Sequence, residues 1–391
     1  MAKNRYLTTA IAEDLREKMV FIGGPRQVGK TTLARDLVGS HFRKTAYFNW
    51  DNKQDRRKLM AAEWPTDAEL LIFDEIHKYR AWKRFVKGEF DTHKAEHHFL
   101  VTGSARLDIY RKGGDSLQGR YHYYRLHPFS VAELSGGGTN KFVPFKELPI
   151  TSRKATDVRE SLEKWGGFPE PFFAGNERVL RRWHTERNDR LLKEDIRDIE
   201  IIRDLGNMQL LGDMLPSKVG SLLSINSIRE DLEVSFRSVA NWLDILERFY
   251  YHFRIRPFAR SSIRSLKKEP KLYLWDWSEV TNDASRYENM VASHLLKFVH
   301  WLNDREGFRA ELYFLRDTSM REVDFLVTID AKPWFAVEVK SQSEHLAPNL
   351  PYFCEKLSIP FSYQLVKKAG VDKTSGGTRI LSADKFLSSL V

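Results

Sequence analysis

Short apolar runs alternate with polar and charged segments through the first part of the chain. Four of these runs are each followed by turn-forming or charged residues, which is typical of buried parallel strands, at residues 19–23, 45–49, 70–74 and 99–102. Leu33, Leu37 and Val38 follow the first run with the spacing of a helix. Strands and helices that alternate in this way predict an α/β fold with an open parallel sheet.

The pattern changes at a Gly-rich segment, residues 135–140. Residues 157–204 are mostly helical and dense in charge, and residues 208–250 predict three short helices. The last of these helices has one apolar face, formed by Val239, Trp242, Leu243 and Leu246. Strands then return around a helix near 285–302, at residues 271–275, 312–315, 322–328, 334–340 and 361–365.

A glycine-rich loop stands between the first predicted strand and its helix. Residues 24–31, Gly-Pro-Arg-Gln-Val-Gly-Lys-Thr, fit the pattern G-x-x-x-x-G-K-[ST], whose backbone N–H groups wrap around phosphates. Lys30 is expected to neutralise the β- and γ-phosphates of ATP, and Thr31 to coordinate Mg²⁺. The strand–loop–helix setting disfavours a plain Gly-Lys turn. The expected nucleotide contacts are Gly24, Pro25, Arg26, Gln27, Val28, Gly29, Lys30, Thr31 and Thr32.

The predicted strand 70–74 ends in two adjacent carboxylates, Asp74 and Glu75. Ligands bind at the carboxyl ends of strands in open parallel sheets, so both acids are expected beside the phosphate-binding loop. We expect Asp74 to hold the Mg²⁺ shell and Glu75 to orient and deprotonate the attacking water. The pair favours ATP hydrolysis over phosphoryl transfer to a metabolite.

Further polar residues follow the strand 99–102. Thr102 or Ser104 is a candidate contact of the γ-phosphate or of the water, and a plain strand-to-loop turn is the alternative. Arg106 and Arg120 are candidates to stabilise transition-state charge, from the same subunit or from a neighbour. The alternative for each arginine is a solvated surface charge.

Taken together, these motifs resemble the AAA+-related ATPases of bacteria and archaea. The matching segments are residues 24–31, Asp74 to Lys78 with Trp82, Thr102 to Ser104, Gly119-Arg120 and Pro128 to Ser130. More narrowly, the chain resembles a subgroup of these ATPases whose C-terminal half has no known function. Residues 166–170 and 193–196 match that subgroup. The resemblance implies an ATPase core, a helical lid and assembly into homo-oligomers. Many AAA+ proteins carry Asn where this chain has Ser104.

The three short helices predict a winged helix-turn-helix. Residues 225–232 and 235–239 have the spacing of a positioning helix, a turn and a recognition-type helix. Its exposed side would present Arg237, Ser238 and Asn241 to phosphates or base edges. The alternative is a structural spacer or an oligomer contact. Basic residues would flank the helix as a wing or loop: Arg254, Arg256, Arg260, Arg264, Lys267 and Lys268.

Two predicted strands near the C-terminus carry acids at spaced positions. Asp324 lies on the first strand, and Glu338 and Lys340 lie two residues apart on the second, so the last two face the same way. A turn at residues 330–333 would bring Asp324 near Glu338. Two carboxylates can hold Mg²⁺ while a lysine positions water and offsets charge on a phosphodiester. Glu288, on the preceding helix, could complete the acidic cluster.

This arrangement resembles the PD-(D/E)XK restriction-endonuclease-like superfamily. The resemblance implies catalytic roles for Asp324, Glu338 and Lys340, with Glu288 as a helper. Two alternatives stay open, because such a pattern also arises on a solvated strand face and many members keep this fold without cleaving DNA.

Composition narrows the class of protein. The chain has 391 residues, 63 Lys and Arg against 53 Asp and Glu, and a formal net charge of +10, which is compatible with a nucleic-acid partner or with ordinary solubility. No apolar run approaches the roughly 20 residues that span a bilayer. No secretory signal is visible, and the single Cys354 cannot form an internal disulfide, so we expect a cytoplasmic protein without a membrane partner.

The sequence therefore predicts four parts: an ATPase core (1–135), a helical lid (136–205), a winged-helix module (206–268) and a nuclease-like domain (269–391). The first functional hypothesis is an ATP- and Mg²⁺-dependent protein that acts on DNA. The second is a regulatory ATPase whose C-terminal domain binds a protein partner without nuclease activity. A small-molecule kinase is disfavoured by the Asp74-Glu75 pair and by the C-terminal half.

Overall fold

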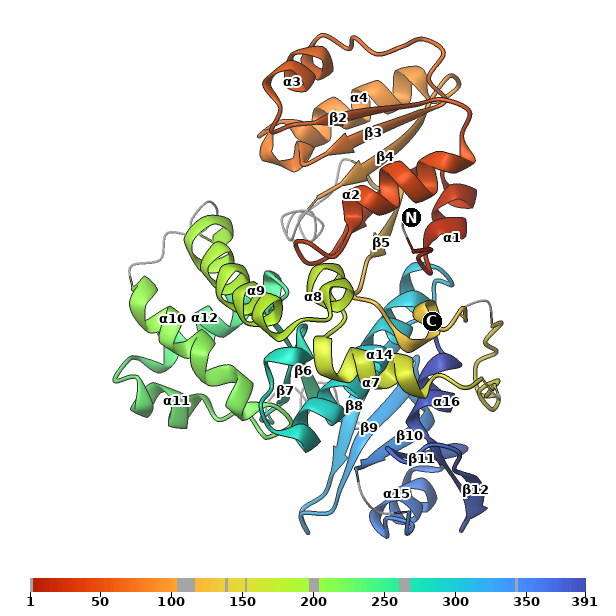
Figure 1. Ribbon diagram of the computed structural model, residues 1–391, viewed down its shortest axis with the longest axis vertical. Coiled ribbons are helices and arrows are strands. Elements are labelled where there is room, and N and C mark those ends of the chain that lie inside the picture. The colour runs from red at the N-terminus through yellow and green to blue at the C-terminus, as the bar shows by residue number, and fades with distance from the viewer. Residues whose placement is uncertain are drawn as a thin grey trace. The chain divides into compact units, whose positions relative to one another are not determined.

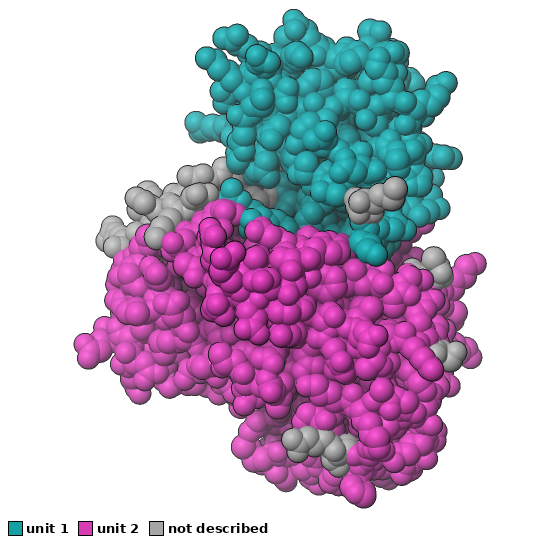
Figure 2. Space-filling model, in the orientation of Figure 1, with its two compact units in different colours: residues 1–128 teal, residues 129–391 magenta. Residues whose placement is uncertain are grey.

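The computed structural model divides the chain into two compact units, residues 1–128 and 129–391 (Figure 2). It describes residues 3–103, 117–137, 140–151, 153–196, 204–259, 268–341 and 344–391, with the side chains of 193–195 left aside.

The first unit is built on a five-stranded parallel sheet with the order β2-β3-β4-β1-β5 (Figure 1). Its strands are β1 (Met19–Gly23), β2 (Thr45–Asn49), β3 (Leu70–Asp74), β4 (His98–Thr102) and β5 (Tyr121–Arg125). Its helical elements are α1 (Thr8–Asp14), α2 (Lys30–Thr32), η1 (Leu33–Val38), η2 (Gly39–His41), α3 (Lys53–Met60), η3 (Ile76–Lys78) and α4 (Trp82–His93). A parallel sheet of this kind is typical of P-loop nucleotide-binding folds.

The central strands of this sheet lie in the core. All five residues of β1 and of β3 are buried, as expected for strands covered on both faces. One side of the sheet packs on α4 through Trp82, Val86 and Phe90. The predicted parallel strands and their order along the chain are confirmed.

The second unit contains the remaining elements. Its helical elements are α6 (Val131–Leu134), α7 (Thr156–Trp165), α8 (Pro169–Ala174), α9 (Glu177–Arg190), η4 (Leu191–Ile196), α10 (Leu205–Met214), η5 (Leu215–Lys218), α11 (Ile225–Asp231), α12 (Phe236–Arg248), η6 (Trp277–Glu279), α14 (Asp283–Asp304), α15 (Asn349–Leu357) and α16 (Ala383–Ser388). Its strands are β6 (His252–Pro257), β7 (Lys271–Leu274), β8 (Ala310–Arg316), β9 (Glu322–Ile329), β10 (Lys332–Lys340), β11 (Phe361–Val366), β12 (Asp372–Ser375) and β13 (Thr378–Ser382).

These strands form one mixed sheet with the order β12-β13-β11-β10-β9-β8-β6-β7. Its centre is made by β8, β9 and β10, which pair antiparallel, and by β11, which pairs parallel with β10. The long helix α14 precedes β8 and contacts it, and α15 connects β10 to β11 (Figure 1). The run α14-β8-β9-β10-α15-β11 is therefore one α/β layer that carries the predicted acidic residues.

The segment expected to be an ATPase lid packs within this second unit. Trp277 donates a hydrogen bond of 2.6 Å to the carbonyl of Leu162 on α7, and Trp183 on α9 donates one of 2.8 Å to Asp276. Because these indole groups are buried, their hydrogen bonds fix α7 and α9 to the C-terminal sheet. The predicted boundaries at 135, 205 and 268 differ from this division, in which residues 129–391 are one compact unit.

The predicted helical trio is present as α10, α11 and α12, and the strands β6 and β7 follow it as an antiparallel pair. Arg237 and Asn241 are exposed on α12, whereas Val239 and Leu243 are fully buried, in agreement with the predicted faces. Arg254 differs from the prediction of a DNA-facing wing, because it is paired with Asp244 at 2.7 Å and also with Glu247. Arg260, Arg264 and Lys267 lie outside the described residues.

Across the described ranges, no helix is both long enough and apolar enough to span a bilayer.

Candidate functional site

The phosphate-binding loop follows β1 and ends at α2, as predicted. Gly24 and Gly29 have φ values of 136° and 99°, which side chains with a Cβ rarely adopt. A Cβ on Gly24 would also lie 2.4 Å from the carbonyl oxygen of Leu126. Lys30 is buried and donates hydrogen bonds to the carbonyls of Pro25 (2.7 Å) and Gly24 (3.1 Å). Its ammonium is therefore held inside the loop, where phosphate oxygens would replace the two carbonyls.

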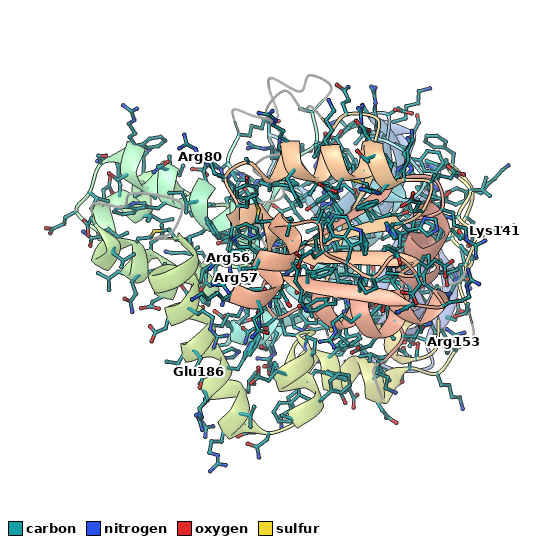
Figure 3. The ribbon with its side chains drawn as sticks, turned by 90° about the horizontal axis from the view of Figure 1, so that it is seen from above. Arg56, Arg57, Arg80, Lys141, Arg153 and Glu186 are labelled. Carbon is teal, nitrogen blue, oxygen red and sulfur yellow. The ribbon has the colours of Figure 1, made fainter. Side chains whose placement is uncertain are left out.

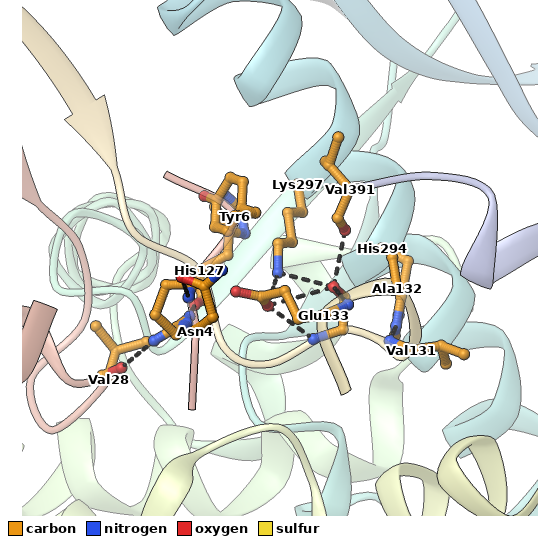
Figure 4. Close-up of polar contacts among 12 residues, drawn as sticks. Asn4, Tyr6, Val28, His127, Val131, Ala132, Glu133, His294, Lys297 and Val391 are labelled. Carbon is orange, nitrogen blue, oxygen red and sulfur yellow. Dashed lines mark hydrogen bonds and ion pairs between the residues drawn. The ribbon is translucent and has the colours of Figure 1, made fainter. Parts of the chain in front are cut away.

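A buried arginine supports this loop from the N-terminal segment. Arg5 donates a hydrogen bond of 2.9 Å to the carbonyl of Val28 and a second to the carbonyl of His127 (Figure 4). Val28 lies inside the loop, and His127 follows β5. Arg5 thus ties the loop to the neighbouring end of the sheet.

Asp74 lies at the carboxyl end of β3 and accepts hydrogen bonds from three hydroxyl groups. Thr31 and Tyr47 donate to its Oδ2 atom at 2.8 Å and 2.7 Å, and Thr102 donates to Oδ1. The hydroxyl of Thr31 and the carboxylate of Asp74 are oxygen ligands of the kind that Mg²⁺ prefers, and they already touch. The predicted pair of Mg²⁺ ligands therefore fits the ion.

Glu75 adopts a left-handed backbone conformation, with a φ of 58°. Its Oε2 atom lies 3.3 Å from Nζ of Lys78 and 3.6 Å from Nε2 of His77. Burial raises the pKa of Glu75, and the charges of Lys30 and Lys78 oppose that rise. A carboxylate with a raised pKa is a stronger proton acceptor, which suits a general base.

Two other predicted residues, Thr102 and Arg120, are placed differently from the expectation. Thr102 is buried and bonded to Asp74, so it orients the acid and does not face a phosphate. Arg120 precedes β5 and pairs with Asp91 at 2.8 Å. The strand β5 runs parallel to β1, so Arg120 lies at the amino edge of the sheet, opposite the phosphate-binding loop. This position does not fit a role of Arg120 within its own subunit, and a role toward a neighbouring subunit stays a prediction. Ser104 and Arg106 lie outside the described residues.

Exposed arginines do occur on elements that follow the carboxyl ends of the strands in the parallel sheet. Arg56 and Arg57 project from α3, which follows β2, and Arg80 lies just beyond η3, which follows β3 (Figure 3). The guanidinium of Arg56 lies 5.8 Å from the ring centroid of Trp50. No motif in the sequence distinguishes these residues, because solvated arginines are common on helices.

In the second unit, the predicted acidic residues meet on two paired strands. The amide of Val339 donates a hydrogen bond of 2.8 Å to Oδ2 of Asp324, and the amide of Asp324 lies 3.4 Å from Oε2 of Glu338. Nζ of Lys340 lies 2.7 Å from Oε1 of Glu338. The hairpin expected from the sequence thus brings Asp324, Glu338 and Lys340 together.

A buried lysine and two further acids complete this cluster. Lys271, the first residue of β7, is 3% exposed, and its Nζ atom lies 2.6 Å from Oε1 of Glu322. The same atom lies 3.6 Å from Glu288 and 3.8 Å from Asp324. Glu288 also accepts a hydrogen bond of 2.7 Å from the hydroxyl of Tyr273. We call Lys271, Glu288, Glu322, Asp324, Glu338 and Lys340 the carboxylate cluster.

Burial and mutual repulsion make Glu288 and Glu338 unusually basic. Burial, followed by the charge of Asp324, raises the pKa of both Glu288 and Glu338 to about 7. Burial lowers the pKa of Lys271, but the charges of Glu288, Asp324 and Glu322 outweigh that effect and leave it raised. Lys271 therefore stays charged at neutral pH.

The donor set of the cluster fits a magnesium ion held by few protein ligands. Mg²⁺ usually keeps several waters and takes one or two carboxylates. Asp324 and Glu338 can supply these two. In the part of the chain that is described, no group of three or more His, Cys, Asp or Glu side chains is arranged to hold a metal. The ammonium of Lys271 lies near Asp324 and near the two remaining acids, Glu288 and Glu322.

The first unit is similar to a known protein family. Residues 16–135 match an AAA domain. The AAA domain coincides with the phosphate-binding loop, the Asp74-Glu75 pair and the parallel sheet. Together they support an ATP-binding and ATP-hydrolysing function of the AAA type. Residues 158–281 and 285–386 match two domains of unknown function, DUF8612 and DUF4143.

Similar proteins match this chain over most of its length. An uncharacterised protein of Methanocaldococcus jannaschii is 24% identical over 339 residues, which are 79% of this chain and 72% of that protein. An uncharacterised protein of Mycobacterium tuberculosis is 22% identical over 341 residues, 84% of this chain and 71% of the other. The Aeropyrum pernix ORC1 protein, solved in complex with DNA, is 12% identical with a TM-score of 0.33, over 75% of this chain and 93% of that one.

Sequence reasoning missed three contributors to the two sites. Tyr47 contacts Asp74 from the neighbouring strand, Arg5 holds the loop from the N-terminus, and Lys271 enters the carboxylate cluster from β7. None of them belongs to a short motif. A lysine at the start of a predicted strand gives no sign that it is buried among acids.

Proposed function

We propose that the chain hydrolyses ATP in its first unit and cleaves DNA phosphodiesters in its second, with Mg²⁺ at both sites. The observation that carries the second half is the convergence of Asp324, Glu338 and Lys340 on paired strands, with Lys340 2.7 Å from Glu338. The ATPase half is supported by the AAA-domain match and by the fold of the phosphate-binding loop.

In the first unit, each residue has a defined task in hydrolysis. The loop amides and Lys30 bind the phosphates, and Thr31 and Asp74 hold the ion shell. Glu75 orients the water and accepts its proton, for which its raised pKa prepares it. Arg5 keeps the loop carbonyls in place while the nucleotide exchanges. Assembly into homo-oligomers would let an arginine of a neighbouring subunit approach the γ-phosphate.

In the second unit, the chemistry is phosphodiester hydrolysis. A bound Mg²⁺ would polarise a phosphoryl oxygen and make its bound water more acidic. Lys340 is 40% exposed, so its ammonium can reach a scissile phosphate while it stays paired with Glu338. Asp324 is oriented by the amide of Val339, which fixes the direction of its second oxygen.

DNA is the proposed substrate because exposed polar and basic groups lie in the same unit as the carboxylate cluster. Arg237 and Asn241 are exposed on α12, the helix that leads directly into β6 of the sheet. The formal net charge of +10 adds a long-range attraction for phosphates.

Cleavage of plasmid and linear DNA in Mg²⁺ tests this proposal. Wild type is expected to nick or linearise DNA, and Glu338→Ala and Asp324→Asn to leave it intact. Glu311→Gln is the matched control, because Glu311 is an exposed acid on β8 that bonds Tyr313. Intact DNA with wild type under all nucleotide conditions would remove the nuclease half and leave the ATPase.

One observation favours a second candidate, a regulatory ATPase whose C-terminal unit binds a protein partner. Glu288, Glu322 and Glu338 each already pair with a lysine or hydroxyl, so the cluster is stable without a metal. Sedimentation with ATP, ADP and no nucleotide separates the candidates. ATP-dependent assembly without DNA affinity would support the regulatory role.

A further inference from the structure

Lys271 is placed unlike the other members of the carboxylate cluster. It lies on β7, outside the run α14-β8-β9-β10-α15-β11 that carries Glu288, Asp324 and Glu338. The backbone of Lys271 is held in place, because it pairs with Ile255 on β6 and forms a bridge with Leu222. A strand outside that run, β7, therefore places the ammonium inside the carboxylate cluster.

Carboxylates and an aromatic ring surround the ammonium of Lys271. Three carboxylates lie within 4 Å of Nζ, at 2.6, 3.6 and 3.8 Å, and the ring centroid of Phe314 lies 5.6 Å away. The backbone at Gly220 covers Glu288, because a Cβ there would lie 3.4 Å from its Oε1 atom. An aromatic face and several carboxylates are the environment that a fixed cation prefers.

The charges of the cluster leave room for a single divalent ion. Binding of a metal requires ionised carboxylates, and with all four ionised they are opposed by Lys271, Lys340 and also Arg316, which lies 2.8 Å from Glu322, so the formal charge is −1. One divalent ion and one phosphodiester would bring that charge to zero. Two divalent ions with the same phosphodiester would leave an excess of +2 in a buried site, which is costly.

We propose that Lys271 stands in for a second metal ion, so that the carboxylate cluster takes one divalent cation, at Asp324 and Glu338, and uses the Lys271 ammonium as its other positive centre. This inference rests on the proposed phosphodiester site. It assigns to Lys271 a positioning role, because it keeps Glu288 and Glu322 away from the ion and does not itself contact the substrate.

The number of bound Mn²⁺ ions tests this assignment without measuring cleavage. The nucleotide-free full chain is titrated with Mn²⁺ and free ion is followed by electron paramagnetic resonance. Ions absent from Glu338→Ala are counted as belonging to the cluster. Wild type and Lys271→Arg are expected to hold one such ion, because both keep the internal cation. Lys271→Met is expected to hold two.

A second variant guards against misfolding of Lys271→Met, which leaves buried acids without their cation. Lys271→Gln keeps a hydrogen-bond donor for Glu322 but carries no charge, so it is also expected to take a second ion in the vacated place. Thermal unfolding and ATP hydrolysis report whether each variant is folded.

Two results would overturn the proposals, and they are distinguishable. Two ions in wild type, or one ion in both folded neutral variants, Lys271→Met and Lys271→Gln, would overturn the role of Lys271 and leave the proposed function standing. Identical Mn²⁺ binding by wild type and Glu338→Ala would instead remove the metal site, and with it the proposed DNA cleavage.

Discussion

The hydroxyl of Tyr47 donates a hydrogen bond of 2.7 Å to Asp74, the carboxylate that also accepts the hydroxyl of Thr31. Burial, followed by the charge of Asp74, raises the pKa of Tyr47, so the phenol stays protonated and remains a donor. Tyr47 thus orients Asp74 from the adjacent strand. Tyr47→Phe is expected to raise the Mg²⁺ concentration needed for half-maximal ATP hydrolysis about tenfold, since a bond to a charged acceptor contributes about 1.5–3 kcal/mol.

Tyr79→Phe is the control for this change, because Tyr79 stacks on Trp50 at a centroid distance of 5.0 Å through its ring. Its Mg²⁺ requirement should match that of wild type. An unchanged requirement in Tyr47→Phe would show that Thr31 and Thr102 suffice to orient Asp74.

Substitutions of Lys30 and Glu75 should affect ATP binding and ATP hydrolysis differently. Lys30→Ala is expected to lose ATP binding, because the ammonium meets the phosphates. Glu75→Gln is expected to bind ATP with near wild-type affinity and to lose hydrolysis by about 10²-fold or more, the contribution typical of a general base. A fluorescent ATP analogue measures binding and phosphate release measures turnover. Lys58→Ala, an exposed lysine of α3, serves as control.

Arg5 should act on nucleotide affinity through the loop. Its guanidinium holds the carbonyls of Val28 and His127, so Arg5→Ala should loosen the loop and raise the KM for ATP about tenfold, which corresponds to about 1.4 kcal/mol. Arg16→Ala removes an exposed arginine from the same terminal segment and should leave the KM unchanged. Equal KM values in both variants would contradict the role of Arg5.

The second unit should lose stability in acid through two buried histidines. Burial lowers the pKa of His294 and of His252 to about 4, from an ordinary value of 6.5. His294 accepts a hydrogen bond from the amide of Val131 on Nε2 and lies near the buried pair of Lys297 and Glu133 (Figure 4). Unfolded histidine binds a proton more readily than the folded one, so their contribution is complete above pH 6.5 and is lost as pH falls toward 4.

Between pH 6.5 and pH 4, protonation of each histidine should lower the free energy of unfolding by up to a few kcal/mol, at about 1.4 kcal/mol per pKa unit. His294→Gln is the comparison, since glutamine does not titrate there. The melting temperature of wild type should exceed that of His294→Gln most at pH 7 and least near pH 4.5. A difference that does not change with pH would mean that folding leaves the pKa of His294 unchanged.

Most of the secondary structure could be predicted, because it depends on local patterns. The strands 19–23, 45–49 and 70–74 were predicted with the bounds they have, since each is a short apolar run ending in a turn or charge. The acidic pair after β3 and the hairpin carrying Asp324 and Glu338 followed from the same reasoning. The division of the chain was not predictable in this way. It depends on buried indole contacts such as that of Trp277 with Leu162, which join residues far apart in the sequence.

The sites were predicted where one segment carries several functional groups. The loop 24–31 is such a segment, and so is the pair Glu338 and Lys340. Residues that enter from other elements, such as Tyr47 and Lys271, were missed because no spacing relates them to the motifs. Arg120 was misplaced because its position at the start of a strand, and not at its end, becomes apparent only from the pairing of β5 with β1.

The pairing of β9 with β10 contains one irregularity that decides what faces Asp324. Ile329 pairs with Lys332 across the two-residue turn Asp330-Ala331, but the register shifts between Pro333 and Phe335, and Phe325 then pairs with Val337. Without that one extra residue, the partner of Asp324 would be a valine. Asp324 and Glu338 are therefore fourteen positions apart, an even number, because both a tight turn and a bulge lie between them. A homologue that lost the bulge would keep both acids in its sequence, but one of them would turn to the other face of the sheet.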